Sequence, residues 1–138
     1  MMEFYSKSDM ETREIAEKFA KNLKVGDVVC LTGDLGAGKT TFTKGIAKAL
    51  HIPYEPVSPT FNIVNAYEGD VSLYHFDLYR LASTEDLYSI DFDSYLFGDG
   101  ILVIEWPEIA FPVLEGYYSV HLTYDGENRK IEISEVQK

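Results

Sequence analysis

The stretch at residues 33–40 constrains the fold of this chain more than any other feature of its sequence. It reads GDLGAGKT, a complete match to the phosphate-binding pattern G-x-x-x-x-G-K-[ST]. The run at 28–31 before it is short and wholly apolar, which is typical of a buried parallel strand. The segment 41–50 after it places its apolar residues on one helical face. A strand, a glycine-rich loop and a helix in that order predict a binding site for a nucleoside triphosphate.

The residue types in this loop suit the chemistry of phosphate binding. Gly36 and Gly38 have no Cβ, so the backbone can curl and direct its N–H groups at phosphate oxygens. We expect Lys39 to reach the β- and γ-phosphates and the hydroxyl of Thr40 to bind Mg²⁺. A glycine-rich turn that happens to precede a lysine is the alternative. The strand before the loop and the helix after it make that alternative the weaker one.

Length and composition restrict the class of protein. A chain of 138 residues has room for one domain, which we place at residues 1–138. Hydrophobic residues make up 46% of the chain, enough for a packed core. No apolar run approaches the roughly 18 residues of a membrane span, and the N-terminus lacks the features of a secretory signal. The lone Cys30 lies within the strand at 28–31 and is expected in the core. These features predict a cytoplasmic protein that does not contact membranes.

The charge balance bears on possible partners. There are 12 basic and 23 acidic residues, which gives a net charge of −11. A chain this acidic is repelled by nucleic-acid phosphates unless its basic residues gather on one face. The densest basic cluster is the pair Arg129-Lys130. Direct nucleic-acid binding is therefore not expected, and a basic protein partner is a reasonable hypothesis.

The rest of the chain predicts an α/β fold with a mixed β-sheet flanked by helices. Ser8 and Glu11 form a capping box at the start of a first helix. Prolines at 53, 56 and 59 exclude regular structure after the second helix. Strands are expected at 60–67 and 71–77 as a hairpin, at 101–104, and at 117–124 and 129–136 as a closing hairpin; short helices should follow Ser83 and Asp91. We expect the centre of the sheet to be parallel and the hairpins to be antiparallel.

Two carboxylates are candidates to complete a nucleotide site. Glu105 follows the buried strand at 101–104, which would place it at the ligand-binding edge of the sheet. Its alternative is an ordinary surface glutamate at a strand end. Asp77 ends a strand whose residues alternate, and we interpret that strand as antiparallel, which locates Asp77 less firmly. Both groups are hard oxygen ligands of the kind Mg²⁺ prefers.

Several smaller features permit two interpretations when each is taken alone. His75 fits a half-buried strand histidine, Arg80 a surface cation and Trp106 ordinary packing. The segment 58–60 is either a rigid turn or a switch loop whose Thr60 hydroxyl senses Mg²⁺ or the γ-phosphate.

Four motifs in series resemble a known family. The runs GDLGAGKTT (33–41), SPTF (58–61), HFDLYR (75–80) and IEWPE (104–108) are similar to those of the bacterial tRNA threonylcarbamoyladenosine biosynthesis ATPases, TsaE, over about residues 8–135. This resemblance implies a P-loop NTPase-like domain that uses ATP and Mg²⁺ to help install threonylcarbamoyl on adenosine 37 of tRNAs reading codons that begin with A. It implies the TsaB–TsaD heterodimer as partner, with tRNA contacted only through that pair. Residues 88–91 depart from the family, whose members commonly have a Leu-Gly pair there.

The resemblance also implies residue roles. Glu105, Lys39, Asp77 and Thr60 would be catalytic, and Thr40, Asp77 and Glu105 would hold the metal. His75, Tyr79 and Arg80 would either position Asp77 or contact the partner. The residues expected to contact the nucleotide are Gly33, Asp34, Leu35, Gly36, Ala37, Gly38, Lys39, Thr40, Thr41 and Trp106.

Other functions stay open at the level of sequence. The guanine-reading pattern N-K-x-D and the switch pattern D-x-x-G are absent, which favours ATP over GTP. A small-molecule kinase would need a lid and several arginines, and the chain has only Arg13, Arg80 and Arg129. A non-catalytic module that uses ATP binding to set its affinity for a partner fits every motif except a catalytic Glu105. With so few arginines, an ATPase of this kind is expected to be slow without its partner.

Overall fold

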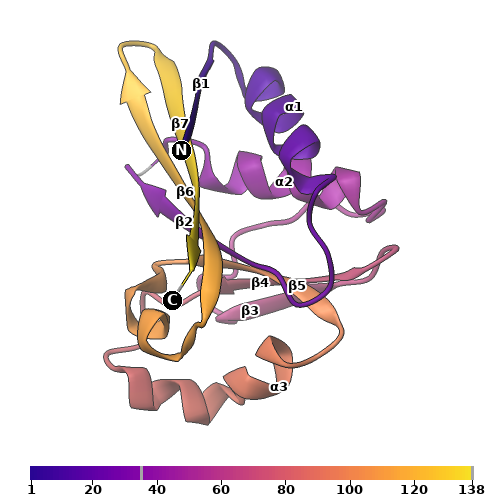
Figure 1. Cartoon of the computed structure of the whole chain (residues 1–138), viewed down its shortest axis with the longest axis vertical. Coiled ribbons are helices and arrows are strands. Elements are labelled where there is room, and N and C mark those ends of the chain that lie inside the picture. The colour runs from indigo at the N-terminus through magenta and orange to yellow at the C-terminus, as the bar shows by residue number, and fades with distance from the viewer. Residues whose placement is uncertain (35, 138) are drawn as a thin grey trace.

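A computed structural model describes residues 1–34 and 36–137, and a mixed β-sheet runs through its centre (Figure 1). Within these residues the sheet has seven strands in the order β1-β7-β6-β2-β5-β4-β3. The strands are β1 Met2–Ser6, β2 Val28–Gly33, β3 Val64–Tyr67, β4 Ser72–Asp77, β5 Gly100–Glu105, β6 Gly116–Asp125 and β7 Asn128–Gln137. The helices are α1 Asp9–Ala20, α2 Lys39–Ala49 and α3 Phe92–Leu96, with 3₁₀ helices η1 Thr84–Ile90 and η2 Pro107–Val113.

The strand directions confirm the expected mixed sheet. The glycine-rich loop follows β2, which is parallel to both of its neighbours, β5 and β6. The pairs β6/β7, β1/β7 and β3/β4 are antiparallel. One interpretation was incomplete: β4 is antiparallel to β3 but parallel to β5. The C-terminal ends of β4 and β5 therefore lie at the same edge of the sheet.

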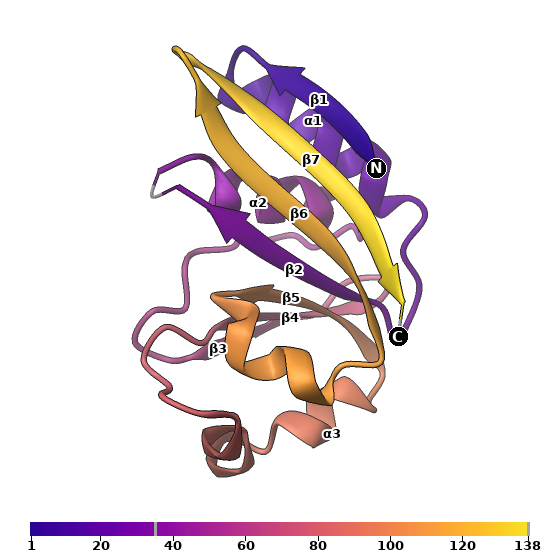
Figure 2. The ribbon, with the colours of Figure 1, turned by 60° about the vertical axis from the view of Figure 1, so that its left-hand side comes forward.

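Each face of the sheet carries its own core. Helices α1 and α2 cover one face, and η1, α3 and η2 cover the other (Figures 1 and 2). Cys30 lies in the second core and is 1% exposed, as expected for a small core residue. Burial raises the pKa of its thiol to about 12, and the Glu108 carboxylate adds to this rise. The thiol therefore stays protonated and unreactive at neutral pH.

Some element boundaries differ from the sequence-based expectation. The strand expected at 60–67 begins only at Val64, because the chain turns over residues 60–62. In this turn the N–H of Ile63 donates to the carbonyl of Pro59 at 2.7 Å, with the φ of Ile63 at +68°. Strand β1 was not expected, since its residues are mostly exposed and show no apolar run. It forms the edge of the sheet beside β7.

The capping of the first helix follows the expected pattern. The Ser8 hydroxyl accepts a hydrogen bond from the Glu11 N–H at 3.1 Å, and the Glu11 carboxylate accepts one from the Lys7 N–H at 2.8 Å. None of the helices formed by residues 1–34 and 36–137 has the length and apolar character that a bilayer span needs.

Candidate functional site

The loop after β2 can be built only with glycine at its first position. Gly33 has a φ of +137°, and a Cβ added there would lie 1.9 Å from the carbonyl oxygen of Leu122 on β6. Gly36 and Gly38 also have positive φ, at +77° and +103°. Leu35, one of the residues expected to contact the nucleotide, lies outside the described residues. At Gly33, Gly36 and Gly38 the backbone therefore takes the positive-φ conformations that allow a loop to direct its N–H groups at phosphate oxygens.

Lys39 opens α2 and lies across this loop. The residue is 9% exposed, and its ammonium donates to the Gly33 carbonyl at 3.3 Å. The same ammonium lies 5.0 Å from the centre of the Trp106 ring. Thr40 and Thr41 follow in the first turn of α2, partly exposed. These two contacts hold the Lys39 ammonium, the cation of the phosphate-binding motif, against the backbone carbonyl of Gly33.

The two predicted acids come together at the edge of the sheet. In the parallel pairing of β4 with β5, Asp77 is the register partner of Glu105. Glu105 is in turn the register partner of Leu31 on β2, close to the glycine-rich loop. Residues in register on parallel strands share a face, and Leu31 packs in the core under α1 and α2. Both carboxylates therefore face α2, with only 6% and 5% of each residue exposed.

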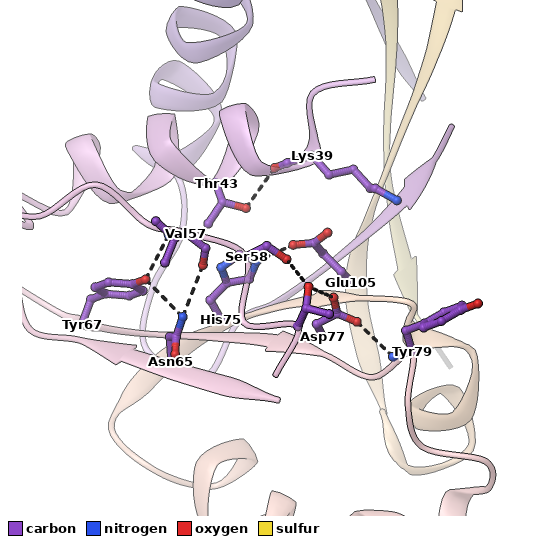
Figure 3. Close-up of polar contacts among 11 residues, drawn as sticks. Lys39, Thr43, Val57, Ser58, Asn65, Tyr67, His75, Asp77, Tyr79 and Glu105 are labelled. Atoms are coloured by element: carbon purple, nitrogen blue, oxygen red, sulfur yellow. Dashed lines mark hydrogen bonds and ion pairs between the residues drawn. The ribbon is translucent and has the colours of Figure 1, made fainter. Parts of the chain in front are cut away.

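Glu105 is held by His75 (Figure 3). The Nε2 atom of His75 lies 2.6 Å from Oε2 of Glu105, and the histidine is fully buried. Its Nδ1 atom finds no partner among the described residues. A carboxylate oxygen accepts hydrogen bonds, so Nε2 carries the proton of this contact. His75 thus donates to Glu105. The resemblance implied that His75 either positions Asp77 or contacts the partner; its hydrogen bond goes to Glu105 and not to Asp77, and the partner contact stays a prediction.

Asp77 is engaged through both of its oxygens. Its Oδ1 accepts from the Tyr79 N–H at 3.0 Å, and its Oδ2 accepts from the Thr60 hydroxyl at 3.4 Å. The Thr60 hydroxyl also lies 3.0 Å from that of Ser58. The segment 58–60 is therefore linked to the site through Asp77. Figure 3 shows Lys39 extending from α2 on the same side of the sheet as Asp77 and Glu105.

An aromatic pair borders the loop. Trp106 follows Glu105 with a φ of +55° and is 42% exposed, while its ring packs against Tyr79 at 4.9 Å between centroids. Sequence reasoning assigned no aromatic contact to Tyr79. The available signal was the position of each aromatic residue: Tyr79 lies two residues after Asp77, and Trp106 comes directly after Glu105. The two packed rings of Tyr79 and Trp106 thus lie next to the Lys39 ammonium, each close in sequence to one of the two acids.

The residues fit a bound metal only in part. No group of three or more His, Cys, Asp or Glu side chains that could hold a metal ion occurs over residues 1–34 and 36–137. A Mg²⁺ ion here would depend on the Thr40 hydroxyl, one or both acids, phosphate oxygens and water, which is the sparse protein ligation that Mg²⁺ commonly accepts.

A second set of contacts was not expected from the sequence. The Glu55 carboxylate accepts a hydrogen bond from Arg13 of α1 at 2.8 Å and lies 3.7 Å from the Lys44 ammonium of α2. The bond from Arg13 lowers the pKa of Glu55. These ion pairs fasten the proline-rich segment at 52–59 to both helices, a few residues before Thr60. Arg13 and Glu55 lie 42 residues apart, so no local pattern in the sequence indicates their contact.

The fold and the loop define a P-loop-like α/β protein. The family model of the threonylcarbamoyl adenosine biosynthesis protein TsaE matches residues 6–132, so this chain belongs to the TsaE family. The TsaE protein of Treponema pallidum is 40% identical over 136 residues, covering 96% of this chain and all of the relative. That of Aquifex aeolicus is 46% identical over 112 residues, covering 78% of each. The crystal structure of YdiB from Bacillus subtilis superimposes with a TM-score of 0.80 at 33% identity, covering 99% of this chain and 86% of that one.

Proposed function

We propose that this chain binds ATP with Mg²⁺ and hydrolyses it as part of the formation of threonylcarbamoyladenosine at position 37 of tRNA. In this proposal it acts as a nucleotide-dependent switch on the TsaB–TsaD pair. One observation carries the catalytic part: the register of β4 with β5 sets Asp77 beside Glu105, on the face covered by α2. Lys39 enters from the start of that helix. Asp77 and Glu105 thus lie side by side on the α2 face, and Lys39 is held against the glycine-rich loop that leads into that helix.

Each group has a distinct task in this proposal. The loop backbone and Lys39 bind the phosphates, and the hydroxyl of Thr40 with Asp77 holds Mg²⁺, which neutralises phosphate charge when bound. Glu105 orients the attacking water. One of its oxygens is fixed by His75 at 2.6 Å, which leaves the other to receive a hydrogen bond from that water.

The scarcity of cations explains why hydrolysis should be slow in the isolated chain. Charge builds on the transferring phosphoryl group in the transition state, and arginine side chains usually stabilise it. The Arg80 guanidinium lies 5.0 Å from the Phe61 ring centre, and Arg13 pairs with Glu55. The partner would supply the missing group or order Thr60. Rapid turnover by the purified chain would contradict this.

The first prediction tests Glu105. Glu105→Ala should keep ATP affinity within a few-fold while hydrolysis falls by on the order of a hundred-fold, because the variant loses an interaction made chiefly in the transition state. The matched control is Glu108→Ala, which removes an exposed carboxylate three residues away and should change neither quantity. Lys39→Ala should weaken ATP binding itself. Unchanged turnover in Glu105→Ala would remove Glu105 from the mechanism.

A second arm of the experiment separates the competing functions. The Glu105→Ala variant is mixed with TsaB, TsaD and tRNA, and the amount of threonylcarbamoyladenosine formed is measured over several turnovers. An ATPase switch predicts loss of repeated turnover. Full modification by the hydrolysis-deficient variant would favour the non-catalytic module, and phosphate transfer to added small acceptors would favour a kinase.

A further inference from the structure

Two hollows lie side by side on the face of the sheet that η1, α3 and η2 cover. One has a volume of about 110 Å³ and lies against η1 and the start of α3. The other measures about 450 Å³ and lies between the end of α3 and the first residues of β2 and β6. Val113, the last residue of η2, lines both hollows. Together they form one groove that a single side chain divides.

This groove lies at the opposite end of the sheet from the candidate nucleotide site. Strands β2, β5 and β6 are parallel, so their first residues meet at one end of the sheet and their last residues at the other. Val28 and Gly116 line the groove at the first end, whereas Gly33 and Glu105 close their strands at the second. In both views α3 and the start of β2 lie away from the end of β2 (Figures 1 and 2). A molecule in the groove therefore leaves the nucleotide site open.

The groove exposes large apolar side chains that lie outside the core. Tyr88 on η1 and Phe97 after α3 are each 79% exposed, and Val113 between them in the groove is 37% exposed. The floor is rigid by contrast, because Phe92 is 1% exposed and its ring packs against that of Phe76 at 5.2 Å between centroids. Exposed aromatic and aliphatic side chains gathered around preformed hollows are typical of a surface that binds another protein.

The charges around the groove are all negative. Residues 81–128 contain ten aspartates and glutamates and no lysine or arginine. Asp91, Asp93 and Glu115 are exposed where they line the groove. Across residues 1–34 and 36–137, these three carboxylates make no hydrogen bond or ion pair with another side chain. They are therefore available to cations from outside the chain.

This combination of charge and shape restricts what can occupy the groove. Nucleic acids and anionic lipid surfaces are repelled by the carboxylates. A protein segment that carries lysine or arginine beside apolar side chains is complementary to both features. Two hollows divided by one side chain fit apolar residues three or four positions apart on a helix, whose Cβ atoms lie roughly 5–6 Å apart.

We infer that this groove docks a basic amphipathic helix of a partner protein. Two apolar side chains of the helix fill the hollows on either side of Val113, and its lysines or arginines lie against Asp91, Asp93 and Glu115. The apolar contacts supply most of the affinity, while the charges set the orientation and the dependence on salt. The groove shares no residue with the proposed ATP site, so this docking does not require ATP to bind.

The test uses two synthetic peptides as probes for the full chain. The first is a helical peptide of about 15 residues with leucine at positions i, i+3 and i+7 and with lysine and alanine elsewhere. The second has the same composition, but its leucines are spread around the helix. Fluorescence anisotropy of the labelled peptides measures their affinities, and the first peptide should bind more tightly.

A pair of matched variants tests the apolar contact. Phe97→Ser should weaken binding of the first peptide by about ten-fold, because it removes an exposed ring from the larger hollow. The control is Phe61→Ser, which removes the same residue type at 80% exposure beside Thr60, outside the groove. It should change the affinity by less than about two-fold. Neither variant should lower the solubility of the chain, since both replace an exposed ring with a polar group.

A second pair separates local charge from net charge. Asp93→Asn combined with Glu115→Gln should weaken binding of the first peptide by about five-fold at low salt, and by less at high salt. Glu14→Gln combined with Glu68→Gln is the control, because it removes two exposed carboxylates outside the groove and changes the net charge equally.

Selective losses in Phe97→Ser and in the Asp93–Glu115 double variant, with both controls unchanged, support the docking groove. Equal affinities of the two peptides, or equal losses in the groove variants and their controls, would show attraction to net charge alone and overturn it. Absence of binding by both peptides also overturns it. Light scattering covers the remaining occupant: if the chain self-associates and Phe97→Ser abolishes this, a second copy fills the groove and the inference fails. ATP binding, measured separately, bears only on the proposed function.

Discussion

The contact between His75 and Glu105 is the most constrained polar pair of the candidate site. Both side chains are buried, and the 2.6 Å bond fixes one carboxylate oxygen and the rotation of the group. His75→Leu should lower the kcat of ATP hydrolysis by about ten-fold or more with KM within about three-fold, because a misdirected carboxylate affects chemistry more than binding. Steady-state kinetics on the purified variant measure both parameters.

A conservative variant separates positioning from packing. His75→Gln retains an N–H near the position of Nε2 and should recover part of the lost kcat, whereas a purely structural defect would follow the volume of the side chain. Equal kcat values in His75→Leu and the unmodified chain would show that Glu105 needs no orienting partner.

Residue-level prediction from the sequence succeeded where the signal was local. The glycine pattern and the apolar strand before Glu105 are local signals, and the structure places Asp77 beside Glu105 at one edge of the sheet, while Lys39 contacts the Gly33 carbonyl. The catalytic roles of these residues stay predictions. The bond from His75 to Glu105 joins residues 30 positions apart and depends on the β4–β5 register. No spacing rule in a single sequence encodes that register.

At the scale of elements, the strand that was missed and the strand whose pairing was predicted only in part had weak or ambiguous patterns. Strand β4 looked antiparallel because its residues alternate; the alternation arises because polar His75 and Asp77 share the α2 face with the site while Phe76 packs in the opposite core. Strand β1 has mostly exposed residues and is ordered by pairing with β7 at the sheet edge. In both cases tertiary pairing, rather than local sequence, decides the structure.

The packing of α1 against α2 supports a prediction about stability. A Cβ at Gly45 of α2 would lie 2.4 Å from the Arg13 carbonyl oxygen and 2.6 Å from the Ala16 Cβ. Gly45→Ala gains about 1 kcal/mol of helix propensity but forces two backbones apart, which typically costs about 1–3 kcal/mol. We expect net destabilisation, seen as a lower urea midpoint. Lys48→Ala, on the exposed side of α2, is the control; a raised midpoint in Gly45→Ala would mean that the helices separate freely.

Across the whole molecule, one segment connects the helices with the site. The proline-rich stretch at 52–59 is held to α1 and α2 through Glu55 at its centre and reaches Asp77 through Thr60 just beyond it. Three prolines limit its backbone to a few arrangements, and both attachments are polar contacts that can exchange partners. In the proposed switch, this segment would respond to a γ-phosphate near Thr60 and would transmit the change to the surface.

The last prediction follows from this connection. A ligand shifts a conformational equilibrium only by its difference in affinity for the two states, and the γ-phosphate is what distinguishes ATP from ADP. The TsaB–TsaD pair should therefore bind this chain more tightly with a non-hydrolysable ATP analogue than with ADP, as calorimetry can measure. Thr60→Val, which removes the hydroxyl bonded to Asp77, should reduce the difference. Equal affinities of the TsaB–TsaD pair for the ATP-analogue and ADP forms would contradict the switch, because the segment at 52–59 would then not respond to the γ-phosphate. The chain would instead act as a scaffold whose binding does not depend on the nucleotide.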